Sequence, residues 1–223
     1  PSVTGPSVRT RASWTRCAAG PRPLVMMSAS WLLSITMFSV AMSGTPGPNN
    51  MMVLASGVNF GYRRTIPHIC GIAGGFFTLL VCVGLGLGTL LTAYPAAHTA
   101  LKIAGGLYLL YLAWRIATAG AIGGTESRPE PMSLMAAAMF QWVNPKAWMM
   151  GVSAMALYTD TSQPFISVLM IATVFGLITF PSVSVWTGFG TALRGILEDD
   201  RRRRIFNIVM GVVLALCIVP MVR

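Results

Sequence analysis

The chain has few charged residues and very few acidic ones. Only 10% of its 223 residues are charged, and six are aspartate or glutamate, whereas soluble domains carry about 25% charged residues. Hydrophobic residues make up 54% of the sequence. This composition excludes a soluble globule, because too few polar side chains remain to cover one. It suits helices that cross a bilayer core about 30 Å thick, each of which needs ~20 apolar residues. We therefore expect an integral membrane protein.

The sequence also lacks the short motifs of several enzyme and binding classes. It contains no phosphate-binding G-x-G-x-x-G or GKS/T loop, no H-E-x-x-H zinc motif and no Ser-His-Asp order. Its four cysteines form no C-x-x-C pair, so neither a metal site nor a disulfide framework is indicated. We therefore expect no enzyme activity, no cofactor and no metal.

The net charge of +10 does not indicate a nucleic-acid partner. The arginines lie in the N-terminal tail and in short polar stretches between apolar segments. Nucleic-acid binding instead favours a basic surface interleaved with exposed aromatic residues. Loop arginines of membrane proteins usually stay on the cytoplasmic side. The expected partner surface is therefore the lipid bilayer.

Six apolar segments follow a polar tail. Residues 1–26 are rich in Pro, Ser, Arg and Gly and contain no apolar run, so we interpret them as a disordered tail or a mis-assigned start. The segments after the tail approach or exceed the length that crosses a bilayer. They cover residues 28–58, 66–92, 97–118, 132–158, 164–190 and 204–222.

The segments form two halves of nearly equal length, residues 27–118 and 132–223, joined by a linker over 119–131. Because each half has an odd number of spans, the second half is inverted in the membrane relative to the first. The predicted fold is an all-α membrane protein with six transmembrane helices in two inverted three-helix repeats. Loop arginines place the linker in the cytoplasm and both chain termini on the opposite side.

The first predicted span contains a group of residues that cannot form a regular helix. Two prolines remove backbone donors, and a glycine between them frees the backbone. The chain can restart beyond them as a half-helix whose N–H groups and positive dipole end suit a carboxylate. The alternative is a kinked, tightly packed helix without a ligand. The candidate substrate-binding residues here are Thr45, Pro46, Gly47, Pro48, Asn49 and Asn50.

The fourth predicted span carries Asn144, Pro145 and Lys146 near its centre. A charged residue at mid-depth costs about 2.5–3.5 kcal/mol on insertion scales and is a functional candidate by default. No acidic residue lies in a predicted span to pair with it. Its expected partners are carbonyls freed by Pro145, the side chains of Asn144 and Gln141, or a substrate anion; the alternative is a purely structural lysine. We expect the broken first and fourth helices to meet near the bilayer midplane.

Several other features have two interpretations. Pro181 is predicted to interrupt the fifth span, where Ser182, Ser184 and Thr187 either line the same cavity or bond back to their own helix. Trp142, Trp148 and Trp186 lie away from the predicted helix ends, unlike residues of an interfacial belt. Small-residue spacings favour close helix packing, within the bundle or between copies of the chain, and so leave a homo-oligomer open. The glycines assigned to packing are Gly71, Gly75, Gly84, Gly88, Gly105 and Gly106.

The glycine-proline group lies in a stretch from Met42 to Gly75 that resembles the LysE/RhtB-type amino-acid exporters. Residues 102–112 resemble that family's third helix, and the Asn144-Pro145-Lys146 group resembles its fourth. The resemblance implies a six-helix transporter of the bacterial inner membrane that exports amino acids or their derivatives, coupled to the proton motive force. Because no carboxylate lies in a predicted span, a neutral amino acid fits better than a cationic one. The alternative function is a membrane scaffold or assembly subunit without transport.

Overall fold

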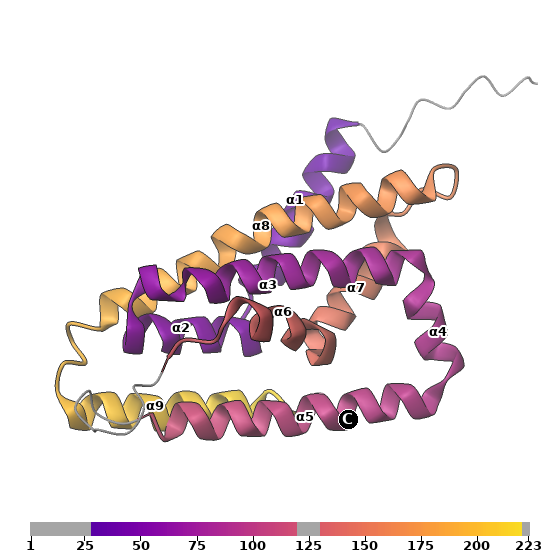
Figure 1. Cartoon of the computed structure of the whole chain (residues 1–223). Coiled ribbons are helices and arrows are strands. Elements are labelled where there is room, and N and C mark those ends of the chain that lie inside the picture. Colours follow the sequence, from indigo (N-terminus) through magenta and orange to yellow (C-terminus); the bar gives the residue numbers. More distant parts are fainter. Residues whose placement is uncertain (1–27, 120–129, 220–223) are drawn as a thin grey trace, which may run out of the picture.

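The computed structural model describes residues 28–119 and 130–219. The tail over 1–26 and nearly all of the linker over 119–131 lie outside these residues. The described part of the chain is helical and contains no strand (Figure 1). Its α-helices and one π-helical turn are, in chain order, α1 (Ala29–Gly44), α2 (Pro48–Phe60), α3 (Tyr62–Cys82), η2 (Val83–Leu87), α4 (Gly88–Ala93), α5 (Pro95–Ala117), α6 (Leu134–Val143), α7 (Pro145–Tyr158), α8 (Pro164–Leu193) and α9 (Asp200–Leu216).

The predicted segments correspond to these elements in order, but only some of them form one long helix. Three helices in the described residues are long and apolar enough to cross a membrane: Tyr62–Leu87, Thr99–Ala117 and Pro164–Leu193. The first and fourth predicted segments each consist of two short helices, α1 with α2 and α6 with α7. The predicted breaks in both segments are therefore confirmed. The second segment starts earlier than predicted, and it bends at Gly86, whose φ is 111°.

The predicted interruption at Pro181 was wrong. The helix α8 continues through this residue from Pro164 to Leu193. A single proline removes only one backbone donor, and neighbouring helices can compensate for this inside a membrane. The structure also contains Pro67 inside α3. One internal proline is therefore compatible with a continuous helix here.

Two pairs of long helices run in opposite directions. In Figure 1, α8 crosses the molecule in the direction opposite to α3, and α9 runs opposite to the neighbouring α5. The long helix α8 packs against α1, α2 and α3, and α6 packs against α3. Apolar side chains from these contacts form the core, including Leu79, Phe140 and Phe175, which are almost completely buried.

Backbones approach closely where α3 meets α6. A Cβ atom at Gly75 would lie 2.5 Å from the Cα atom of Ala138, and one at Gly71 would lie 2.7 Å from the Cβ atom of Ala137. A larger residue at either position would have to push α6 away from α3. These two glycines thus pack helices within a single chain.

The other glycines assigned to packing differ in their surroundings. A Cβ atom at Gly84 would overlap the Val168 side chain. Gly105 is buried. A Cβ atom at Gly88 would meet its nearest neighbour at 3.4 Å, and one at Gly106 at 3.9 Å, which are ordinary contact distances. Substitution by alanine therefore needs no displacement at Gly88 or Gly106.

A second close approach joins α2 to α8. A Cβ atom at Gly57 would overlap the Thr187 carbonyl, and one at Gly190 would overlap the Leu54 carbonyl. The same helix α2 is tied to α9 near its C-terminal end. The side chains of Asn59 and Asn207 donate to each other, with N···O distances of 2.9 and 3.2 Å. Helix α2 thus makes its closest contacts with helices of the second half.

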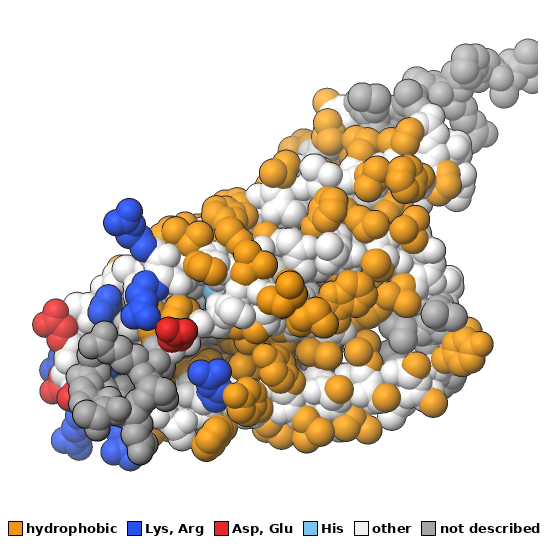
Figure 2. Space-filling model, in the orientation of Figure 1, with side chains coloured by type: hydrophobic (Ala, Val, Ile, Leu, Met, Phe, Trp, Pro, Cys, Tyr) orange, Lys and Arg blue, Asp and Glu red, His pale blue; other side chains and the backbone are white. Residues whose placement is uncertain are grey.

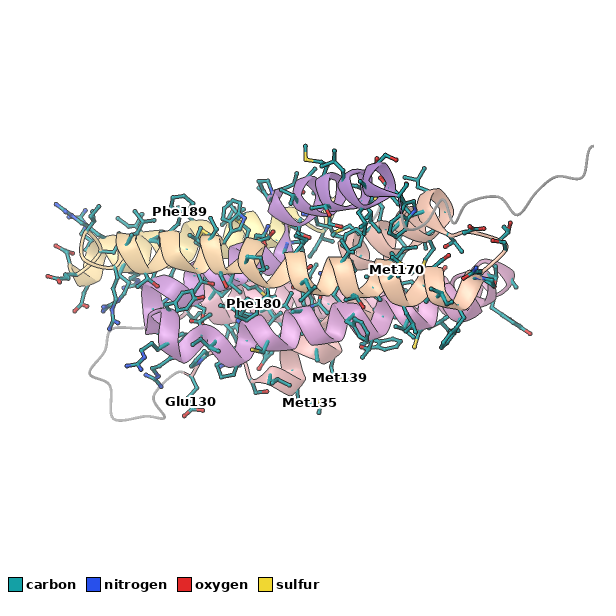
Figure 3. The ribbon with its side chains drawn as sticks, turned by 90° about the horizontal axis from the view of Figure 1, so that it is seen from above. Glu130, Met135, Met139, Met170, Phe180 and Phe189 are labelled. Atoms are coloured by element: carbon teal, nitrogen blue, oxygen red, sulfur yellow. The ribbon has the colours of Figure 1, made fainter. Side chains whose placement is uncertain are left out.

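Apolar side chains cover much of the outer surface (Figure 2). Met135 and Met139 on α6, and Phe180 and Phe189 on α8, project outward (Figure 3), with 66%, 58%, 38% and 62% of their surfaces exposed. Lys and Arg side chains gather at the end of the molecule where α9 begins (Figure 2). The belt of apolar surface fits contact with lipid tails, and the basic end fits the cytoplasmic side.

Candidate functional site

The first helix break is set by two prolines. Helix α1 ends at Gly44, and α2 begins at Pro48. The residues that precede the prolines are extended: Thr45 has φ −68° and ψ 146°, and Gly47 has φ −179° and ψ 177°. A residue before proline disfavours the α conformation because of steric clash with the ring. Two such residues in succession account for the break.

Breaking a helix leaves carbonyl groups at its C-terminal end without their usual partners. In this structure, several donors replace those partners. The Asn50 side-chain amide donates to the carbonyls of Ser43 and Thr45, at 2.8 Å each. The Trp186 indole N–H donates to the Gly44 carbonyl at 3.2 Å. These contacts stabilise an open backbone in surroundings where unpaired carbonyls are costly.

Lys146 supplies further donors to this break. Its Nζ atom donates to the Thr45 carbonyl at 2.7 Å, to the Thr45 hydroxyl at 2.8 Å and to the Pro46 carbonyl at 3.4 Å. The C-terminal end of a helix carries a partial negative charge, so it attracts an ammonium group. The side chain also packs over Gly47, where a Cβ atom would lie 2.7 Å from Lys146 Cδ.

The predicted partners of Lys146 were therefore only partly right. Its ammonium does bind backbone carbonyls, but they belong to the first break rather than to the break at Pro145. Proline 145 starts α7, which directs the Lys146 side chain across to α1. The prediction that the two breaks approach each other is confirmed by these hydrogen bonds.

The second break has caps of its own. Asn144 is extended, with φ −83° and ψ 110°, and its side chain accepts a hydrogen bond from Lys146 N at 3.1 Å. The Trp148 indole donates to the Trp142 carbonyl at 2.8 Å. Trp148 and Trp186 thus each donate to a carbonyl at one of the two breaks. This role explains why these tryptophans lie away from the predicted helix ends.

A pair of amide side chains joins the two breaks on their inner side. Asn49 Nδ2 donates to Gln141 Oε1 at 2.8 Å, and Gln141 Nε2 donates to Asn49 Oδ1 at 3.2 Å. Gln141 is completely buried and also donates to the Ala137 carbonyl at 2.9 Å. This reciprocal pair fixes the start of α2 against the end of α6.

The first turn of α2 has no side-chain cap, unlike the first turn of α7, which the Asn144 side chain caps. Its N-cap residue is Gly47, and no side chain caps it. The first N–H groups of a helix have no partner inside the helix, and together with the helix dipole they attract anions. Three residues at the uncapped start of α2, Gly47, Asn49 and Asn50, line a small cavity.

The cavity has a volume of about 30 Å³, whereas a single water needs roughly 10–15 Å³. Ser43, Asn49, Asn50, Gln141, Asn144, Lys146 and Thr179 provide its polar lining. Met42, Gly47, Phe76, Ala147, Met150 and Val183 complete it. Of these residues, Lys146 alone carries a charge. This volume has room for about two water molecules.

The residues singled out in the sequence gather around this cavity. The ones that line it directly are Gly47, Asn49, Asn50, Gln141, Asn144 and Lys146. Thr45 and Pro46 bind the Lys146 ammonium, and Pro48 and Pro145 begin the half-helices. The other lining residues were not among the candidates: Met42, Ser43, Phe76, Ala147, Met150, Thr179 and Val183. Thr179 and Val183 lie one turn apart on α8, but nothing in the local sequence marks them. Thr187 instead donates back to the Val183 carbonyl at 2.9 Å.

Comparison with known proteins assigns the chain to a family. A family model described as LysE type translocator matches residues 39–221, which include both breaks. The chain belongs to the LysE type translocator family. No solved structure matches the chain. The match confirms the resemblance found in the sequence and makes the protein a member of a family of membrane transporters.

Similar members of this family include efflux proteins from enteric bacteria. The cysteine/O-acetylserine efflux protein of Shigella flexneri is 30% identical over 199 residues, which cover 87% of this chain and 96% of that protein. Those of Escherichia coli K12 and Salmonella typhimurium LT2 are 30% and 29% identical over 198 residues, with the same coverage. This LysE-type protein is therefore similar over most of its length to efflux proteins for cysteine and O-acetylserine.

Proposed function

We propose that this protein is a secondary transporter of the bacterial inner membrane that exports an amino acid, or an amino-acid derivative, with an uncharged side chain. The observation that carries the proposal is the contact between the two helix breaks, made by Lys146 with Thr45 and Pro46. Within a translocator family, such a contact marks the place where broken helices build a solute site. Family membership favours transport over a scaffold role.

The charge distribution around the cavity supports an uncharged side chain. Of the residues that line it, Lys146 alone is charged, and a substrate with a cationic side chain would meet repulsion without a compensating carboxylate. The names of the similar efflux proteins give cysteine and O-acetylserine as their cargo. Cysteine, with an ordinary thiol pKa of about 8.5, is uncharged at its side chain at neutral pH. We infer cargo of this class for the present chain.

The carboxylate of the substrate fits the uncapped first turn of α2. Asn49 and Asn50 of this turn line the cavity, and no side chain caps the turn. Backbone N–H groups at a helix start are effective anion donors. The inner amide pair holds this turn in place, which makes Asn49 and Gln141 positioning residues for the bound carboxylate.

The arrangement supports six membrane crossings in two inverted three-helix repeats. At ~1.5 Å per residue, neither α1 nor α2 spans the hydrocarbon core alone, but the two in series exceed it. The same holds for α6 followed by α7. The opposite directions of α3 and α8, and of α5 and α9, fit an inverted repeat (Figure 1). The basic end of the molecule then faces the cytoplasm, and the termini face outward.

The driving force is the proton motive force. The sequence contains no nucleotide-binding motif, so ATP hydrolysis within the chain is not indicated. The titratable ammonium of Lys146 lies at the junction of the two breaks. A proton gradient can therefore act on the group that connects the two halves.

An export assay tests the substrate class. A host strain lacking its own amino-acid exporters is loaded with O-acetylserine, cysteine, lysine or arginine, and the medium is analysed with and without expression of the full chain. We expect export of the first two and none of the cationic pair. Equal export of lysine or arginine would refute the neutral-substrate proposal, and a lack of export of every compound would refute transport of these amino acids.

Reporter fusions test the orientation. A reporter fused after Val219 should be active on the periplasmic side, and one inserted in the 119–131 linker should be active in the cytoplasm. The two fusions share the same chain and differ only in reporter position. Activity of both reporters on one side would indicate an even number of crossings between the linker and the C-terminus, and so would overturn the three-helix repeat.

A further inference from the structure

We propose that the Lys146 ammonium occupies the position of the substrate's own ammonium group, so that substrate binding displaces Lys146 from the first break. This inference rests on the proposed function and specifies how an amino acid enters the site. It assigns Lys146 the role of an internal competitor. In the alternative role, Lys146 would hold the substrate's carboxylate.

The hydrogen bonds of Lys146 favour the competitor role. An ammonium group has three donors and no acceptor. All three have acceptors at the first break: the Thr45 carbonyl, the Thr45 hydroxyl and the Pro46 carbonyl, at 2.7, 2.8 and 3.4 Å. In this position the ammonium has no donor left for a carboxylate. It binds the negative end of α1, whereas a carboxylate is attracted to the positive start of α2.

The same acceptors match the α-ammonium of an amino acid. A free amino acid carries a primary ammonium like that of lysine, separated by one carbon from its carboxylate. The negative end of α1 and the positive start of α2 lie on either side of the break formed by Thr45, Pro46 and Gly47. A zwitterion at the break therefore places each of its charges against the helix end of opposite sign. No charged side chain is needed for either contact.

The Lys146 side chain occupies the space next to the first break. Its Cδ and Nζ atoms lie 2.7 and 3.0 Å from where a Cβ atom at Gly47 would be, so the side chain covers the backbone that a ligand must approach. The cavity beside it measures only about 30 Å³, while small-molecule sites commonly measure about 300–1,000 Å³. Exchange of one ammonium for another keeps the exposed carbonyls paired throughout, because one donor group enters as the other departs.

Two isomeric probes separate the competitor role from the carboxylate role. O-acetyl-L-serine has a free ammonium and a carboxylate, while N-acetyl-L-serine has the carboxylate but no ammonium. The full-length protein in detergent is given a short pulse of reductive methylation near neutral pH, with the reagent in excess over the ligand so that the ligand's own amine does not deplete it, and labelling of Lys146 is compared by mass spectrometry with labelling of Lys102. We expect O-acetyl-L-serine to raise the labelling rate of Lys146 severalfold and to leave Lys102 unchanged. N-acetyl-L-serine should raise neither rate.

A variant gives an independent readout. Lys146→Met keeps an unbranched side chain without donors, and Lys102→Met is the matched control. We expect Lys146→Met to tighten O-acetyl-L-serine binding by about tenfold, because the displaced charge-assisted hydrogen bonds no longer compete. Lys102→Met should bind as the wild type does. If Lys146→Met does not fold, the labelling of the wild type decides alone.

The outcomes distinguish this inference from the proposed function. If O-acetyl-L-serine is exported and bound but protects Lys146 from labelling, or if Lys146→Met weakens binding, Lys146 holds the carboxylate and the competitor role is refuted. If O-acetyl-L-serine is neither bound nor exported, the proposed cargo fails and the inference fails with it. Increased labelling together with tighter binding by the variant supports both.

Discussion

Replacing Gly75 by alanine should loosen the contact between α3 and α6, and Gly74→Ala provides a matched control. A Cβ atom at Gly75 would lie 2.5 Å from Ala138 Cα and 2.6 Å from Ala138 O, whereas one at Gly74 meets nothing within 4 Å. Carbon atoms pack at about 3.5–4.0 Å. Helix α6 must therefore withdraw by roughly 1 Å, the difference between these distances.

The expected loss of unfolding free energy follows from comparing Gly75→Ala with Gly74→Ala. Both substitutions gain the same backbone term, about 0.5–1 kcal/mol for alanine over glycine in a helix. Only Gly75→Ala adds overpacking, which typically costs about 1–3 kcal/mol. We expect the two free energies of unfolding to differ by that overpacking cost. Withdrawal of α6 would also lengthen the bonds between Gln141 and Asn49, now 2.8 and 3.2 Å, and should reduce export.

The assay is unfolding by SDS in mixed micelles, followed by tryptophan fluorescence, together with export of O-acetylserine from cells. Gly74→Ala should match or exceed the wild-type stability and export at the wild-type rate. Equal stability of the two variants, within about 0.5 kcal/mol, would show that α6 is not held against α3 as described, since surface changes stay within that range.

Three further predictions concern other parts of the molecule. Trp148→Phe removes the donor to the Trp142 carbonyl and should lower the free energy of unfolding by about 1 kcal/mol or more. Trp142→Phe keeps that hydrogen bond, because the acceptor is the backbone carbonyl. An equal loss of stability in both variants would refute the capping role of Trp148. Backbone N–H groups in the first turn of α9 lower the pKa of Asp199, so its stabilisation of that turn is present above the ordinary carboxyl pKa and is lost as the pH falls below it. The protection of the amide hydrogens there, relative to intrinsic exchange at the same pH, should therefore fall in acid for the wild type but not for Asp199→Asn. His68 is 2% exposed, and neither ring nitrogen has a partner among the residues the structure describes. His68→Leu should therefore leave the free energy of unfolding unchanged or raise it by about 1 kcal/mol. A clear loss of stability would reveal a hydrogen-bond partner of the ring.

The sequence was most informative where backbone chemistry is local. Two prolines around Gly47, and the Asn144-Pro145 pair, force extended residues whatever surrounds them, and both breaks were predicted. Pro181 has the same chemistry but lies in a continuous helix, because packing of α8 against three other helices outweighs one lost hydrogen bond. The partner of Lys146 could not be predicted, because it depends on how α7 lies against α1. The lining residue Thr179 was missed for the same reason.

The amide pairs on α2 determine which parts of the molecule can move relative to one another. Asn49 ties the start of this helix to α6, Asn59 ties its end to α9, and the contact at Gly57 holds its middle on α8. A rocking motion of the first half as one rigid body would have to break all three attachments. Rotation of α1 about the extended Thr45–Gly47 stretch breaks none of them. Movement of α1 at this stretch would instead have to break its contacts with α8, including the hydrogen bond from Trp186 to the Gly44 carbonyl, while α2 would stay attached to the second half.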